Sequence, residues 1–98
     1  MIDKELVESI QQLYEQAFMF YSPIVEELCN RNDVSQKELE YELDSILSFC
    51  QSDDMLSLFK RLCRKFYKQY PETVASYIMT YKELYGGWND FYYIFNKK

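Results

Sequence analysis

The sequence predicts an all-α protein, a compact bundle of four to five helices, and three observations favour this fold class. Apolar residues recur at three- and four-residue steps through almost the whole chain, as they do along one face of a helix. Two glycines and two prolines in 98 residues leave little material for the tight turns of a β-sandwich or barrel. Hydrophobic residues make up 48% of the chain, which is enough to form a core. Because the chain has only 98 residues, we expect a single helical domain over residues 1–98.

The first two helices are predicted on either side of Ser22-Pro23. Asp3 is placed as the N-cap of the first helix, and serine followed by proline is a favourable start for the second, because proline lacks only an N–H that is unpaired there anyway. We therefore expect a break at this dipeptide and a short helix that ends near residues 30–33. The apolar face of the first helix comprises Leu6, Ile10, Leu13, Tyr14, Ala17, Phe18 and Tyr21, and that of the second comprises Ile24, Val25 and Leu28.

The clearest helix start lies at Ser35. Ser35 and Glu38 have the spacing of a capping box, and Val34 and Leu39 are placed as a hydrophobic staple. We expect this helix to end near residues 51–54, where acidic residues suit the positive N-terminal end of the next helix. Its inward face comprises Leu39, Leu43, Ile46, Leu47 and Cys50.

Two further helices and an aromatic tail complete the prediction. One helix spans about residues 54–69, and Pro71 ends it because proline disfavours helical geometry at the preceding residue. The next ends at Gly86 as its C′ residue. Their inward faces comprise Met55, Phe59, Leu62 and Phe66, and then Val74, Tyr77, Ile78, Tyr81 and Tyr85. Residues 88–95 are predicted to form either a short helix capped by Asn89 or an extended segment. Their aromatic side chains either pack into the core or form an exposed binding surface.

The sequence lacks the residues of the common catalytic classes. It has no histidine, no glycine-rich phosphate loop and no metal-type cysteine spacing. We therefore expect no enzyme activity, no catalytic residue, no metal site and no cofactor. Cys29, Cys50 and Cys63 are interpreted as reduced, buried thiols of a cytoplasmic protein, since neither a secretory signal nor a membrane-spanning segment is visible. The alternative is a reactive Cys63, whose thiol pKa the neighbouring Arg61 and Arg64 would lower.

Charge is divided unevenly along the chain. Residues 1–55 contain 13 acids and three bases, whereas residues 56–98 contain three acids and eight bases. The basic residues of the 54–69 helix could contact nucleic-acid phosphates as a binding or regulatory adaptor module, or they could form a solvated face paired with neighbouring acids. The acidity of the rest of the chain would repel a polyanion, so we expect neither nucleic acid nor a membrane as partner. The basic residues are Lys60, Arg61, Arg64, Lys65 and Lys68.

An acidic surface that carries one tyrosine is the candidate binding site. On a helix, Glu38 and Glu42 share one flank, Glu40 and Asp44 share the other, and Tyr41 projects between them. An exposed tyrosine bordered by carboxylates has the anatomy of an interface anchor, and the acids would steer a basic partner. The alternative is a solvated helix face on which Tyr41 packs against a neighbouring helix. Asp53 and Asp54 are secondary candidates for the same surface.

The overall profile of an acidic, helical, tyrosine-rich chain of this length resembles the small immunity proteins that neutralise bacterial toxins. The profile is similar to that of the immunity proteins of colicin nucleases and of contact-dependent growth inhibition systems. The resemblance implies a stoichiometric inhibitor that occludes the active site of a basic toxin domain, in most cases a nuclease. Phage inhibitors of bacterial defence share the profile, and a helical adaptor or self-associating subunit that uses the C-terminal aromatics is a third possibility.

Overall fold

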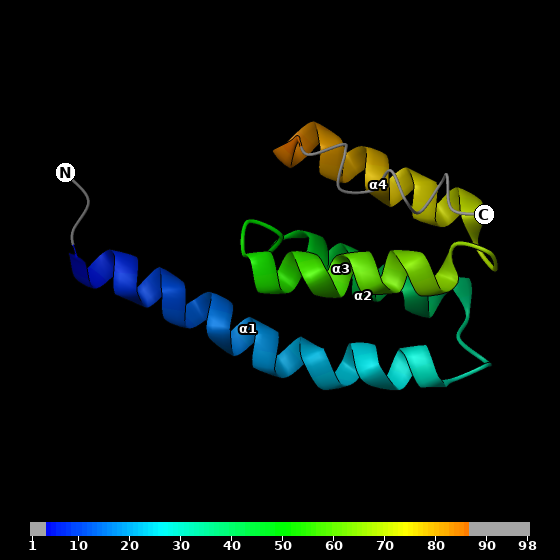
Figure 1. Ribbon diagram of the computed structural model, residues 1–98, viewed down its shortest axis with the longest axis horizontal. Helices are drawn as coiled ribbons and strands as arrows, with labels where there is room; N and C mark the ends of the chain where they lie inside the picture. Colours follow the sequence, from blue (N-terminus) through cyan, green and yellow to red (C-terminus); the bar gives the residue numbers. More distant parts are fainter. Residues whose placement is uncertain (1–3, 87–98) are drawn as a thin grey trace.

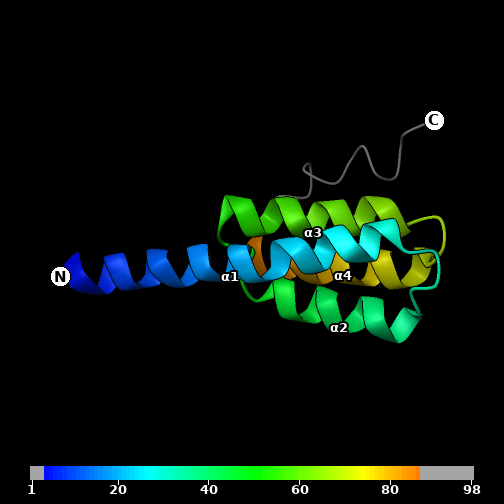
Figure 2. The ribbon, with the colours of Figure 1, turned by 90° about the horizontal axis from the view of Figure 1, so that it is seen from below.

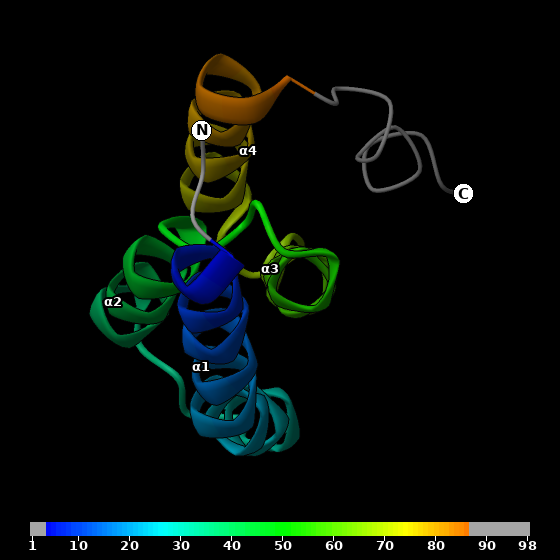
Figure 3. The same ribbon diagram turned by 90° about the vertical axis from the view of Figure 1, so that its left-hand side faces the viewer.

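The computed structural model describes residues 4–86, which form four α-helices and no strand. They are α1 (Lys4–Asn30), α2 (Gln36–Leu47), α3 (Asp53–Phe66) and α4 (Pro71–Tyr85). Successive helices run in opposite directions, and α1 and α4 lie on opposite sides of the layer formed by α2 and α3 (Figures 1 and 3). This is an up-down-up-down arrangement, and four helices fall within the predicted four to five.

The hydrophobic core is centred on α3, which contacts each of the other three helices. Six of its 14 residues are buried, more than in any other described helix. Phe59 and Leu62 are both completely inaccessible to solvent. The predicted inward faces of α2, α3 and α4 are confirmed, because the residues predicted for them are buried or packed against the core.

The starts of α2, α3 and α4 and the end of α4 follow the predicted signals, whereas α2 ends at Leu47, before its predicted end near residues 51–54. The Ser35 hydroxyl accepts the backbone N–H of Glu38 at 3.1 Å, and the Glu38 carboxylate accepts that of Ser35 at 3.3 Å, which completes the capping box. The α3 helix begins at Asp53 behind a Ser52 cap and ends at Phe66, three residues before its predicted end. Pro71 is the first residue of α4, and Gly86 ends that helix with a φ of 77°.

The predicted break at Ser22-Pro23 is wrong, because α1 continues through it as a single helix of 27 residues. Proline in a helix interior removes one backbone hydrogen bond. The apolar stripe nevertheless continues in register across this point, and Val25 and Leu28 beyond it are buried in the core. Packing of that stripe, rather than local propensity, stabilises most helices in folded proteins, and here it keeps the two halves in one helix.

The first part of α1 extends past the end of the other three helices (Figure 2). We call residues 4–13 the α1 arm. Leu6, Ile10 and Leu13, predicted to share one apolar face, are 54%, 44% and 53% exposed. Only further along do residues of the same face, such as Ala17, enter the core. The proposed Asp3 cap and the aromatic segment 88–95 lie outside the described residues.

Two tyrosines of α4, and Tyr70 directly before it, connect this helix to the backbone of the α2 region. The hydroxyl of Tyr70 donates to the carbonyl oxygen of Val34 at 2.7 Å. Tyr77 donates to the Glu40 carbonyl at 3.3 Å, and Tyr85 donates to the Leu47 carbonyl at 2.9 Å. Because α2 and α4 run in the same direction, the three bonds follow each other along both segments. Part of the high tyrosine content of the chain therefore serves to join these helices.

Candidate functional site

The outer face of α2 presents Tyr41 to solvent. Its side chain is 69% exposed, so it does not lie flat against a neighbouring helix. The carboxylates divide as predicted. Glu38 and Glu42 border a hollow on the α1 side, and Glu40 and Asp44 border a groove on the α4 side.

The hollow between α1 and α2 has a volume of about 410 Å³ and a partly apolar wall formed by Ile24 and Leu28. Tyr41 and Glu42 line it from α2. Glu42 is half-buried, and its Oε2 atom has no hydrogen-bond partner among residues 4–86. Burial raises the pKa of the Glu42 carboxyl above its ordinary value. The carboxyl of Glu42 is therefore not fully solvated, unlike that of an exposed member of the acidic group.

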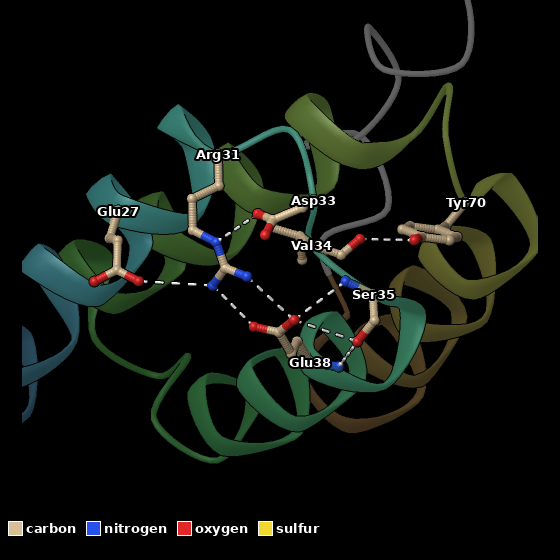
Figure 4. A network of polar contacts seen from close by, with 7 residues as sticks. All are labelled: Glu27, Arg31, Asp33, Val34, Ser35, Glu38 and Tyr70. Atoms are coloured by element: carbon tan, nitrogen blue, oxygen red, sulfur yellow. Dashed lines mark hydrogen bonds and ion pairs between the residues drawn. The ribbon is translucent and has the colours of Figure 1, made fainter.

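Glu38 is engaged within the protein rather than free for a partner. Its carboxylate accepts two hydrogen bonds from Arg31, at 2.9 and 3.3 Å, in addition to its part in the capping box (Figure 4). The Arg31 side chain first, and the backbone N–H of Ser35 second, lower the pKa of Glu38. Arg31 also pairs with Asp33 at 2.9 Å and with Glu27 at 3.6 Å. This network joins the end of α1 to the start of α2.

The groove between α2 and α4 is the larger hollow, with a volume of about 710 Å³. Glu40 and Asp44 line it from α2, and Glu72 and Tyr77 line it from α4. Burial first, and hydrogen bonding to Asp44 second, raise the pKa of the Tyr77 hydroxyl. Sequence reasoning missed the α4 residues of this groove, because only the packing of α4 beside α2 brings them to the acidic helix.

Asp53 and Asp54 do not line either hollow beside Tyr41. Both are exposed in the first turn of α3, where negative charge is favourable. Asp54 instead borders a separate hollow of about 400 Å³ together with Tyr14 and Glu15 of α1. The structure thus separates these two secondary candidates from the surface around Tyr41.

The basic side chains of α3 are partly engaged by the acidic helix beside them. Arg61 donates to the carboxylate of Glu26 in α1 at 2.9 Å, as expected if neighbouring acids pair with this face. Hydrogen bonding to Arg61 lowers the pKa of Glu26. Arg64 and Lys65 are exposed. At least one of the predicted bases is therefore in an ion pair, which weakens the case for a continuous phosphate-binding surface.

The cysteines are free thiols whose environments disfavour the thiolate. Burial raises the pKa of Cys50 to about 12, and it also raises that of the fully buried Cys63. Cys63 is completely inaccessible to solvent, and the desolvation of its sulfur raises its pKa, so the hypothesis that neighbouring bases activate this thiol is wrong. Cys29 is only partly buried, contrary to the expectation for all three, and desolvation is again the main cause of its raised pKa.

Within residues 4–86, no group of three or more acidic or cysteine side chains is placed to hold a metal ion. None of the described helices combines the length and hydropathy that a bilayer span requires. Comparison of the chain with protein-family models, with curated proteins and with solved structures finds no match in any of the three.

Proposed function

We propose that this protein binds a basic protein partner through the outer face of α2 and inhibits it stoichiometrically. The observation that carries this proposal is the exposed Tyr41 between two hollows with carboxylates on both sides. Tyrosine is enriched among the residues that dominate binding energy, because a rigid ring supplies large contact area at low entropic cost.

The charges around Tyr41 favour a partner rich in lysine and arginine. Asp44 is exposed, and together with Glu40 and Glu72 it makes the α2–α4 groove acidic. Such a surface would accelerate encounter with a positively charged domain and reject an acidic one. Glu38 contributes less to this surface, because its charge is already paired with Arg31.

The class of inhibitor that this surface suits best is an immunity protein of a bacterial toxin system. An acidic helical protein could cover the substrate-binding cleft of a toxin, most simply a nuclease whose cleft is basic. It would then block the activity of the toxin without catalysing any reaction itself. The support for this is the acidic half of the chain, the helical scaffold and the exposed tyrosine. In this proposal the protein needs neither a cofactor nor a catalytic residue.

To test the proposal, the partner is captured from the native cytosol, or the basic domain encoded by the neighbouring reading frame is used. Calorimetry then measures the affinity of the partner for the wild type and for each variant. We expect Tyr41→Ala to weaken binding by about 2 kcal/mol, which is roughly 30-fold. We expect Asp44→Lys to lower the association rate and the salt dependence of that rate.

The matched control is Glu83→Lys, which changes net charge by the same amount at an exposed α4 residue outside both hollows. It should leave affinity nearly unchanged. Substitution of Glu38 is avoided because it would disturb the α1–α2 junction as well. If Tyr41→Ala bound the partner as tightly as the wild type, the α2 surface would not be the binding site.

A further inference from the structure

The hollow between α1 and α2 is bordered by a carboxylate whose charge the described residues leave unpaired. Glu42 is half-buried, and its buried Oε2 atom has no hydrogen-bond partner among residues 4–86. A carboxylate that is taken out of water loses solvation free energy, which only hydrogen bonds or a nearby cation can replace. Glu42 therefore lowers the stability of the free protein, and a cation that entered the hollow would remove this cost.

The two bases that line the hollow do not supply the missing partner. Arg31 is already paired with three carboxylates, among them that of Glu38 at 2.9 Å (Figure 4). Lys37 is exposed to solvent. Burial is the cause of the raised pKa of Glu42, and neither base offsets it. Three acids and two bases line the hollow, so its net charge is −1 and one further cation would neutralise it.

The other walls of the hollow suit a long side chain with an apolar stem. Ile24 and Leu28 contribute apolar surface from α1, and the exposed ring of Tyr41 borders the hollow from α2. Methylene groups pack on aliphatic surface, and a cation is attracted to the face of a tyrosine ring. Arginine combines an apolar stem, a single positive charge and a planar head group that stacks on aromatic rings.

We propose that this hollow receives one arginine side chain of the basic partner, with its stem against Ile24 and Leu28, its guanidinium over the Tyr41 ring and its charge facing Glu42. The inference rests on the proposed function and adds the chemistry of the residue by which the partner is anchored. Lysine fits less well, because a compact ammonium neither stacks flat on a ring nor donates two parallel hydrogen bonds to a carboxylate.

The proposal also accounts for a charge that is unfavourable in the free protein. Stability and ligand recognition often oppose each other at the same residue, because a group placed to meet a ligand lacks a partner until the ligand binds. An arginine in the hollow would shield Glu42 from water, and an ion pair in such a place is stronger than one on the open surface. The same carboxylate would thus weaken the free fold and strengthen the complex.

Titration of the full chain with N-acetyl-arginine methylamide, followed by NMR chemical shifts, tests the site without the partner. We expect saturable shifts at Ile24, Leu28 and Tyr41, with a dissociation constant in the millimolar range because a single small ligand buries little surface. The lysine derivative should bind at least about threefold more weakly. The norleucine derivative, which has a similar stem and no charge, should cause no saturable shift at these residues.

Two variants that remove one carboxylate each show which group holds the cation. Glu42→Gln should weaken binding at the hollow about fivefold or more, because it removes the charge and keeps the shape of the side chain. Glu40→Gln is the matched control, since it makes the same change on the other flank of α2, where the residue lines the α2–α4 groove instead. Affinity measured at Ile24 and Leu28 should then equal that of the wild type, and circular dichroism should show unchanged helix content in both variants.

The arginine site and the proposed function fail in different ways. No saturable shift at the hollow, equal losses in Glu42→Gln and Glu40→Gln, or a lysine derivative that binds as tightly as the arginine derivative would overturn the arginine site. A partner that binds Tyr41→Ala as tightly as the wild type would overturn the proposed function, and the arginine derivative would still bind the wild-type hollow.

Discussion

At the scale of single residues, two glutamates on the same flank of α2 have opposite electrostatic environments. Arg31 and a backbone N–H stabilise the Glu38 carboxylate, so its pKa lies below the ordinary value of 4.5. Glu42, one turn further along, has no such partner in the part of the chain that the structure describes, and burial raises its pKa above the same value. Ionised Glu38 therefore stabilises the fold, whereas ionised Glu42 destabilises it.

This difference predicts opposite effects of the same substitution. Glu38→Gln should lower the melting temperature at neutral pH, and its deficit should shrink as pH falls below 4.5 through the lowered pKa of the folded protein. Glutamine retains the capping-box geometry, so the change removes mainly the charge interaction with Arg31. Glu42→Gln should raise the melting temperature at neutral pH, because its carboxylate becomes unfavourable as pH rises above 4.5 through the raised pKa.

Thermal unfolding followed by circular dichroism at a series of pH values measures both effects. The two variants carry the same change in net charge, so each is the control for the other. At a pH low enough to protonate both carboxyls, the gain from Glu42→Gln should vanish. Two variants with the same sign at neutral pH would contradict the assignment of these environments.

At the scale of elements, the two prolines of the chain lie at helix positions where proline has opposite effects on stability. Pro71 is at the start of α4, where an N–H has no helical partner, and Pro23 is in the interior of α1. An interior proline costs up to about 3 kcal/mol relative to alanine. Pro23 is exposed, so its ring makes little contact that would offset this cost.

We expect Pro23→Ala to raise the free energy of unfolding by about 1–3 kcal/mol, because it restores a backbone hydrogen bond in α1. Pro71→Ala should be neutral or slightly destabilising, since it removes a favourable first residue and restores no helical bond. Urea denaturation of both variants provides the comparison. A loss of stability in Pro23→Ala would mean that the geometry imposed by proline is needed for packing of α1 on α3.

At the scale of the whole molecule, stability is concentrated in one part of the fold. The core surrounds α3, and Phe59 packs at 5.9 Å between ring centroids against Tyr81 of α4. Phe59→Ala should cost about 3–5 kcal/mol, a large share of the stability of a domain of this size. Leu13→Ala in the α1 arm should cost much less, because half of that side chain is already in water. Chemical denaturation of the two variants distinguishes a core residue from one outside it, and equal losses would contradict the description of the arm as uncovered.

Most helix boundaries in this protein could be read from the sequence because their causes are local. The capping box at Ser35, the start of α4 at Pro71 and its end at Gly86 depend on residues a few positions apart. The division of the acidic residues on either side of Tyr41 follows from the helical repeat alone. The exposure of Tyr41 depends on where the neighbouring helices pack, so the tertiary structure was needed to decide it. The continuation of α1 through Pro23 could not be predicted, since the packing that maintains it comes from a distant part of the chain.

By itself, then, the sequence determined where the helices after residue 34 begin, their inward faces and the position of Tyr41 between two acidic flanks. Only the tertiary structure decided that Glu42 is half-buried, that Glu38 is held by Arg31, and that α4 completes an acidic groove beside α2. It also decided that the first part of α1 extends past the other helices and leaves its apolar side chains exposed. The physical reason is the distance along the chain over which each effect acts. Helix caps and apolar periodicity depend on residues within one or two helical turns, whereas the burial and ion pairing of a side chain depend on which helix packs beside it.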